Sequence, residues 1–239
     1  MASRRTGGAG TGMGEIHEDI TLRDRAPVFR NREEAGDLLA GYLLDFPGFR
    51  DPLSCPIPAG GIPVGIAVAR ALGCPIRPVI VRKVQVPWNT EAGFGAVAWD
   101  GRVFLNEPLL AALHLPPDQV EAAIEKARKN VGERVVNFSA GQAFPDPEGR
   151  SCILIDDGLA SGYTMTAAAE ALRALHPRQI IVAVPTGSLS AARKVSAIVD
   201  DVICLNVRTG PSFAVADAYE EWYDIAEKDA IRMLMDATG

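Results

Sequence analysis

The sequence predicts an α/β fold in which a parallel sheet is flanked by helices. Short apolar runs at residues 153–155, 179–185 and 201–206 are of the kind that a parallel sheet buries on both faces. Helical segments at residues 167–175 and 189–199 alternate with these runs. Such alternation implies right-handed crossovers between parallel strands. The chain of 239 residues is long enough for one core of this type with an insertion.

The chain begins with a segment, residues 1–14, that is expected to be a disordered N-terminal extension. It contains Arg4 and Arg5 but no apolar stretch, so it does not form a secretory signal. Met13 lies within it, and a natural start at that residue is left open. Residues 15–239 are expected to form a single domain.

The first elements of that domain are expected to be a helix, a strand and a glycine loop. Residues 31–46 form an amphipathic helix capped by Asn31, with Glu33 and Glu34 in its first turn. Residues 53–65 then indicate a strand and a loop that lead into a helix over residues 66–72. The pair Gly60 and Gly61 in this loop is a candidate anion-binding site, although such a pair more often marks a tight turn.

A further strand is indicated at residues 78–84, with Arg82 and Lys83 at its end. We expect both side chains at the same sheet edge as the other loops, where they would stabilise negative charge on a leaving group. The alternative is a solvated pair at a strand end. Residues 85–95 are rich in turn formers and form a loop, and residues 95–99 and 102–105 form a hairpin.

An insertion covering about residues 107–150 separates the two halves of the chain. It contains a charged helix at about residues 118–134 and a stretch rich in proline and glycine at residues 141–149. Glu121, Glu125 and Lys129 fall on one face of this helix. That face is expected to be solvated, and its use in a homodimer is left open.

The most informative stretch is residues 152–166, where acidic, small and hydroxyl-bearing residues follow an apolar strand. Asp156 and Asp157 come directly after the strand, and ligands of open α/β sheets bind beyond the carboxyl ends of the strands. Carboxylates accept hydrogen bonds, so the pair suits ribose hydroxyls or the water ligands of Mg²⁺. The small residues that follow allow backbone amides to approach a phosphate at the start of the next helix, where Ser161 and Thr164 add hydroxyls. The alternative is an Asp-Asp-Gly turn that caps a helix without a ligand.

The segment Ile155-Asp-Asp-Gly-Leu-Ala-Ser-Gly-Tyr-Thr164 resembles the phosphoribosyl pyrophosphate (PRPP) signature of type I phosphoribosyltransferases. Ser161 replaces the first threonine of the family's Thr-Gly-x-Thr, which keeps the hydroxyl. The resemblance implies a PRPP-dependent pentosyltransferase of nucleotide salvage, with the fold of that family and Mg²⁺ as cofactor.

The resemblance also implies roles for individual residues. Asp156 and Asp157 would hold the ribose hydroxyls, and Mg²⁺ would be held through PRPP and water, with Asp156 or Asp157 nearby. Residues 85–95 would be a mobile loop over the reaction centre. Arg82 and Lys83 are the predicted catalytic cations because of their charge and their position at the end of the preceding strand. The 5′-phosphate would be bound by Gly158, Leu159, Ala160, Ser161, Gly162, Tyr163 and Thr164, and the pyrophosphate by Ala59, Gly60 and Gly61.

Two alanines depart from patterns known in the family. Ala59 stands where a bacterial and archaeal branch reads Pro-Arg-Gly-Gly, so a bidentate phosphate ligand is missing. Ala160 stands where enzymes that act on 6-oxopurines carry an aspartate that assists proton transfer. Candidate residues for a hood over the acceptor are Trp88, Phe213, Tyr219, Trp222 and Tyr223. The favoured alternative for Tyr219, Trp222 and Tyr223 is a helix face packed on the core.

Composition excludes some partners. The net charge of −6 and the pI near 5.2 argue against nucleic-acid binding, which requires a basic surface. No apolar stretch is long enough for a membrane helix. The four cysteines lie in apolar segments without Cys-x-x-Cys spacing, which favours buried reduced thiols and a cytoplasmic location.

Three functions therefore remain open from the sequence. The first is transfer of ribose 5-phosphate from PRPP to a small acceptor, such as a nucleobase, with release of pyrophosphate. The second is a non-catalytic PRPP or nucleotide sensor, which Ala59 keeps open. The third is a hydrolase or phosphatase that uses the acidic pair on a sugar phosphate.

Overall fold

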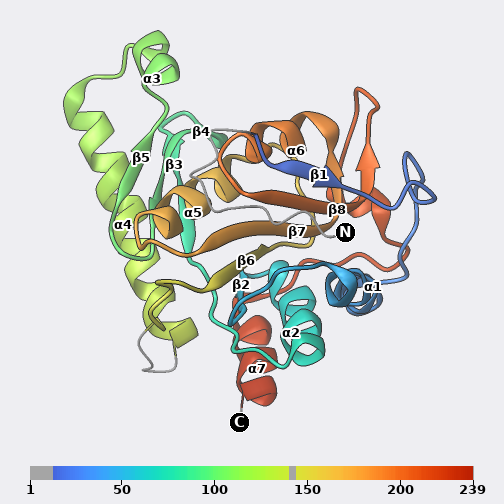
Figure 1. Cartoon of the computed structure of the whole chain (residues 1–239). Helices are drawn as coiled ribbons and strands as arrows, with labels where there is room; N and C mark the ends of the chain where they lie inside the picture. Colours follow the sequence, from blue (N-terminus) through green and yellow to red (C-terminus); the bar gives the residue numbers. More distant parts are fainter. Residues whose placement is uncertain (1–12, 140–143, 239) are drawn as a thin grey trace.

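The computed structural model describes residues 13–139 and 144–238 (Figure 1). The predicted disordered extension therefore lies outside the described residues as far as residue 12. Gly14 is ordered, since its amide donates a hydrogen bond of 2.7 Å to the carbonyl of Ser196.

A 5-stranded parallel sheet forms the centre of the fold, with the order β1-β8-β7-β6-β2. Its strands are β1 (Glu15–His17), β2 (Leu53–Pro56), β6 (Ser151–Ile155), β7 (Gln179–Ser188) and β8 (Asp201–Arg208). The predicted α/β fold with a parallel sheet is confirmed. Strand β1 was not predicted, because three residues carry too little periodicity to be recognised.

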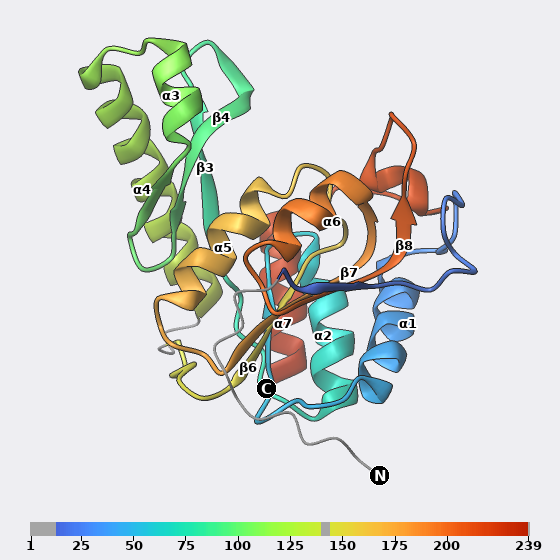
Figure 2. The same ribbon diagram turned by 45° about the horizontal axis from the view of Figure 1, so that its top comes forward.

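Helices cover both faces of this sheet (Figures 1 and 2). Helices α1 (Arg32–Asp45) and α2 (Gly61–Leu72) lie on one face, together with α7 (Glu227–Thr238). Helices α5 (Tyr163–Arg173) and α6 (Leu189–Ser196) lie on the other. Strand residues alternate between the two layers: Ile153 packs with α1 and α2, whereas Leu154 packs with α5 and α6. Burial on both faces explains the continuous apolar runs in the sequence.

Asn31 caps α1 as predicted. Its side-chain oxygen accepts a hydrogen bond of 3.1 Å from the amide of Glu34. Helix α2 begins at Gly61, earlier than the predicted residue 66, so the glycine pair stands at the helix N-terminus itself.

A second, 3-stranded antiparallel sheet holds the hairpin region. It consists of β3 (Val81–Val86), β4 (Asn89–Ala98) and β5 (Val103–Leu105). The hairpin that turns at Asp100 and Gly101 is confirmed, and Gly101 has the positive φ of 84° that such a turn requires. Residues 85–95 were predicted as a loop; instead they complete β3 and β4 around a turn at Pro87 and Trp88.

The assignment of residues 78–84 to the parallel sheet is wrong. The chain first runs beside β2, where the amide of Val79 bonds to the carbonyl of Pro56 at 2.9 Å. It then leaves that edge and enters β3 in the other sheet. A short apolar run predicts a strand, but it does not specify which strand will be its partner.

The helical insertion is confirmed as α3 (Glu107–Leu113) and α4 (Pro117–Ser139). Helix α4 packs on the second sheet, and the face that carries Glu121, Glu125 and Lys129 is exposed as predicted. Residues 140–143, which reach into the proline- and glycine-rich stretch, lie outside the described residues.

Two predictions from composition concern thiols and membranes. All four cysteines are free, and Cys74 is half-buried while the other three are buried. Across residues 13–139 and 144–238, no helix combines the length and the apolar character that crossing a bilayer would require.

Candidate functional site

The acidic pair stands at the carboxyl end of the buried strand β6. Asp156 and Asp157 are both half-buried, and the amide of Asp157 donates a hydrogen bond of 2.9 Å to Oδ1 of Asp156. Burial, followed by the charge of Asp157, raises the pKa of Asp156 well above its usual range. Burial also raises the pKa of Asp157, while the guanidinium of Arg32 opposes that rise. The pair is thus held where both carboxylates are costly to ionise.

Arg32, from the first turn of α1, is the residue of the site that the sequence did not reveal. Its side chain is 4% exposed, and its Nε lies 2.8 Å from Oδ2 of Asp157. Its Nη1 donates to the carbonyl of Tyr223 at 2.8 Å. A positive charge in the first turn of a helix is disfavoured by the helix dipole. The position of Arg32 next to the N-cap residue was therefore the sequence feature that indicated a role other than helix stability. Arg32 fixes one oxygen of Asp157 and leaves the other for a ligand.

Aromatic residues of the C-terminal segment enclose this arginine. The ring centroid of Trp222 lies 3.8 Å from Cζ of Arg32, and Tyr219 donates its hydroxyl to the carbonyl of Asp157 at 2.6 Å. The favoured helix interpretation of Tyr219, Trp222 and Tyr223 is wrong, because they follow a short 3₁₀ helix (Val215–Ala218) in irregular structure. Spacings of three and four residues match a helix without requiring one.

The aromatic hood candidates are divided by the fold. Trp222 and Tyr223 are 37% and 50% exposed, and their rings lie against Arg32, the partner of Asp157. Phe213 is half-buried in the preceding loop. Trp88 is 66% exposed at the turn of the separate hairpin.

The glycine loop before α2 lies directly against the acidic pair. A Cβ placed on Gly60 would stand 2.1 Å from Oδ2 of Asp157, and one on Gly61 would stand 2.7 Å from the carbonyl oxygen of Ile155. Both positions therefore require glycine for close approach. The structure brings together the two loops that the sequence predicted separately.

The amides of this glycine loop differ in availability. In the described part of the chain, no acceptor is found for the amides of Ala59 and Gly60. The amide of Gly61 bonds to the carbonyl of Ile57 at 3.0 Å, so this amide is used within the fold, and pyrophosphate binding by Gly61 stays a prediction. The tight turn that places Gly60 beside Asp157 is closed by this hydrogen bond from the amide of Gly61.

The predicted 5′-phosphate loop leads into the N-terminus of α5. Among residues 13–139 and 144–238, nothing accepts from the amides of Ala160, Ser161, Gly162, Tyr163 and Thr164. These amides are free to bind an anion, as unpaired helix N-termini commonly do. Gly162 has φ of 76°, which turns the chain into the helix.

Two members of the loop serve packing. The amide of Leu159 bonds to the carbonyl of Thr186 at 2.9 Å, so this amide is used within the fold, and the phosphate contact of Leu159 stays a prediction. A Cβ on Gly158 would stand 2.4 Å from Cγ1 of Val215, so this glycine admits the 3₁₀ helix. These contacts attach the loop to β7 and to the C-terminal segment.

Lys194 of α6 is a second residue that the sequence did not reveal. Its Nζ donates to the carbonyl of Ser161 at 3.1 Å and lies 3.7 Å from the ring centroid of Tyr163. It adds positive charge beside the free amides. Its sequence position, in the helix after β7, gave no sign of this contact.

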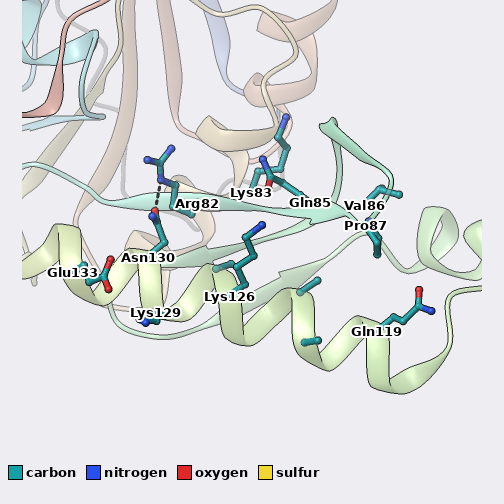
Figure 3. A pocket seen from close by; sticks show the side chains of 13 residues that line it. Arg82, Lys83, Gln85, Val86, Pro87, Gln119, Lys126, Lys129, Asn130 and Glu133 are labelled. Atoms are coloured by element: carbon teal, nitrogen blue, oxygen red, sulfur yellow. Dashed lines mark hydrogen bonds between the residues drawn. The ribbon is translucent and has the colours of Figure 1, made fainter.

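Arg82 and Lys83 do not join these loops as a pair. Nε of Arg82 donates to Oδ1 of Asn130 on α4 at 2.7 Å, whereas Lys83 points away from α4 (Figure 3). The predicted location at the parallel-sheet edge is wrong because both residues belong to β3.

Comparison with known proteins decides what kind of domain carries this arrangement. A family model described as "Phosphoribosyl transferase domain" matches residues 33–221, which include both loops and the acidic pair. The chain belongs to the phosphoribosyltransferase family. The predicted resemblance to this family is thereby confirmed.

Individual relatives agree with this assignment. Two Mycobacterium tuberculosis proteins, from strains CDC 1551 and H37Rv, carry names that place them provisionally among the phosphoribosyl transferases; each is 30% identical over 207 residues. The match covers 87% of this chain and 46% of each relative, so the chain spans about half of their length. The crystal structure of TT1426 from Thermus thermophilus is similar, with a TM-score of 0.75 and 31% identity, and the match covers 89% of this chain and 100% of that one.

The donors at the site fit the chemistry of Mg²⁺. Among the described residues, no group of three or more histidine, cysteine or acidic side chains could enclose a metal. The two carboxylates are oxygen donors of the kind that Mg²⁺ prefers, and this ion commonly completes its shell with water and substrate phosphates. An ion shared with a ligand therefore suits these residues better than an all-protein site.

Proposed function

We propose that the protein transfers the 5-phosphoribosyl group of PRPP to a small-molecule acceptor and releases pyrophosphate. The observation that carries this proposal is the contact between the two predicted loops. Gly60 approaches the carboxylate of Asp157 so closely that a methyl group would not fit. Carboxylates that can accept hydrogen bonds from sugar hydroxyls thus lie beside two loops with free amides, one of them at a helix N-terminus. A sugar that carries phosphates at two ends requires both kinds of group.

In this proposal each part binds one portion of PRPP. Asp156 and the free oxygen of Asp157 accept the ribose hydroxyls, and the amides of residues 160–164 bind the 5′-phosphate. The amides of Ala59 and Gly60 bind the pyrophosphate. The bond from ribose C1 to the pyrophosphate oxygen breaks with its electron pair on the pyrophosphate, and the acceptor forms the new bond to C1 and loses its proton.

Mg²⁺, when bound with PRPP, neutralises negative charge on the leaving pyrophosphate. Asp156 and Asp157 would lie nearest to it and would orient its water ligands. Lys83 is retained in the proposal as the cation that approaches the leaving group, since it points away from α4 (Figure 3). Arg82, bound to Asn130, is not assigned to this step.

Calorimetry with PRPP and Mg²⁺ tests the binding step. The wild-type protein should bind, and the Asp156→Asn/Asp157→Asn double variant should not. Asp37→Asn, a change at a 63% exposed position on α1, serves as the control and should bind normally. Absence of binding by the wild type under these conditions refutes the proposal.

A second function, sensing of PRPP without catalysis, is favoured by one observation. Ala59 provides no side chain for the pyrophosphate, so fewer groups stabilise the charge that develops on it. A screen for pyrophosphate release across nucleobases and small amines separates the two functions. Release with any acceptor supports the transferase, while tight binding without release across the panel supports the sensor.

A further inference from the structure

A groove of about 810 Å³ lies between β3 and the insertion helix α4 (Figure 3). Its volume is in the range of small-molecule sites, about 300–1,000 Å³. It is lined by Arg82, Lys83, Gln85, Val86, Pro87, Gln119, Ala122, Ala123, Lys126, Ala127, Lys129, Asn130 and Glu133. None of these residues belongs to the acidic pair, the glycine loop or the free amides, and Lys83, the one member assigned above to the PRPP reaction, points away from α4 (Figure 3).

On the α4 side of the groove, Ala123 and Ala127 pack against the core of the second sheet, whereas the remaining lining residues do not. The helix packs on the second sheet through larger buried residues, among them Val131 and Phe138. The groove is lined instead by small or polar side chains at helical spacing, such as Gln119, Ala122 and Lys126. These three are exposed, and alanine leaves space where a leucine would fill it. The fold therefore does not require this choice of residues.

The charge of the groove is opposite to that of the chain. Among its described lining residues, Arg82, Lys126 and Lys129 are basic and Glu133 alone is acidic, while Lys83 belongs to the lining but points away from α4. The whole chain carries a net charge of −6. A concave surface with one sign of charge concentrates ligands of the opposite sign. The groove is thus suited to an anion.

Arg82 strengthens this conclusion because its charge lacks a direct counter-ion. Its Nε bonds to the neutral side chain of Asn130, and no carboxylate within the described ranges forms an ion pair with it. Glu227, which lies nearby, pairs instead with Arg134 at 2.7 Å. Burial and the charge of Arg134 lower the pKa of Arg82. A guanidinium held beside another guanidinium is stabilised by an incoming anion.

We propose that the groove between β3 and α4 is a second ligand site, which binds an organic polyphosphate of nucleotide size. Its phosphates would lie between Arg82 on β3 and Lys126, which extends from α4 towards that strand (Figure 3). Its organic part would lie on Pro87, Ala122 and Ala123, the members of the apolar lining that are not buried. Basic residues on both walls favour several phosphates over a single anion, and the apolar portion favours an organic molecule over inorganic phosphate.

Titration calorimetry with ATP, GTP and inorganic triphosphate tests the site in the full chain. All titrations use the Asp156→Asn/Asp157→Asn background, in which the PRPP site is disabled, so heat from that site is removed. At least one nucleotide should bind more tightly than inorganic triphosphate. The affinity should fall as the salt concentration rises, because exposed charges are screened.

A matched pair of double variants locates the binding. Lys126→Ala/Lys129→Ala should weaken nucleotide binding about tenfold or more, because each lysine contributes a charge-assisted contact. Arg70→Ala/Arg128→Ala removes the same charge from exposed positions outside the groove, 71% and 47% exposed, and should leave the affinity unchanged. Circular dichroism confirms that both variants are folded.

Three outcomes would overturn the proposal: no nucleotide binds, inorganic triphosphate binds as tightly as either nucleotide, or both double variants weaken binding equally. Failure of the PRPP proposal would not affect this result. PRPP binding is measured with the acidic pair intact, and nucleotide binding is measured with that pair replaced.

Discussion

At the scale of single residues, the two carboxylates of the pair have different surroundings. Asp157 is held by Arg32 and by the contact of Tyr219 with its carbonyl. Asp156 accepts a hydrogen bond from the amide of Asp157, and within the described residues no cation pairs with it. An unpaired carboxylate beside another carboxylate costs stability, and such groups are typical of functional sites.

Replacing Asp156 should therefore stabilise the fold and remove PRPP binding. We expect Asp156→Asn to raise the free energy of unfolding at pH 7 by about 0.5–2 kcal/mol, as changes at strained functional positions commonly do. Urea denaturation and PRPP calorimetry on the same preparations check both effects. Asp37→Asn should change neither stability nor PRPP binding. A destabilised Asp156→Asn protein would contradict the description of Asp156 as a carboxylate that costs stability.

The gain in stability should depend on pH in a defined direction. The folded-state pKa of Asp156 is raised, so the folded state binds its proton more tightly than the unfolded state does. The wild type consequently loses stability as pH rises from about 4, the unfolded value, through the folded pKa. The advantage of Asp156→Asn should be largest at neutral pH and should disappear towards pH 4. A constant difference between the unfolding curves would show that this carboxyl does not titrate as described.

Arg32 should act on PRPP through Asp157. Arg32→Met removes the partner of a carboxylate that is 13% exposed, and should destabilise the protein by about 3 kcal/mol. It should also shift the midpoint of the pH profile of PRPP binding to higher pH, because the pKa of Asp157 rises when the guanidinium is removed. Arg32→Lys should restore charge but neither the planar contact with Trp222 nor the second hydrogen bond, and so should recover part of the shift. Equal pH profiles for all three proteins would limit Arg32 to a structural role.

At the scale of elements, the site is formed where the loop after β2 meets the loop after β6. The sequence predicted both loops and both strands, because apolar runs followed by small residues are local signals. It did not predict that the amides of Leu159 and Gly61 are used by the fold. Those bonds join each loop to Thr186 and Ile57, and such partners follow from the packed fold instead of from local sequence.

The close approach of the two loops yields a test at Gly60. Gly60→Ala places a methyl group against the carboxylate of Asp157, and should weaken PRPP binding at least about tenfold. Gly41→Ala, in the middle of α1 with nothing within 4 Å of the added carbon, is the matched control. It should leave PRPP binding unchanged and stabilise the helix by about 0.5–1 kcal/mol. PRPP affinity is measured by calorimetry and stability by urea unfolding; normal affinity in Gly60→Ala would contradict the loop contact.

At the scale of the whole molecule, the insertion is attached to the core by an ion pair between Arg134 of α4 and Glu227 of α7. Arg134 is 7% exposed and Glu227 is 35% exposed, so the pair is only partly desolvated. Because α4 also forms one wall of the basic groove, this contact helps to hold that wall in place.

Breaking this ion pair should loosen the insertion while the PRPP site stays intact. Glu227→Gln should destabilise the protein by about 1–3 kcal/mol, below the range for fully buried pairs because of the exposure of Glu227. Hydrogen exchange in α4 should accelerate more than exchange in β6. Glu220→Gln, at an exposed position, is the control. Uniform acceleration throughout the chain would show that the insertion does not open separately.

Local features could be predicted from the residues alone: the strands of the parallel sheet with the exception of β1, the cap of α1, the hairpin turn, and the acidic pair followed by a phosphate loop. Each is specified by residues within about one element, through periodicity, capping or turn chemistry. Three features followed from the packed chain instead: Arg82 bonds to Asn130, residues 78–84 leave the parallel sheet, and Arg32 binds Asp157, which lies 125 positions away in the sequence. The physical reason is that a side chain's partner depends on which segments the core brings together, and that choice is made by the packing of the whole chain.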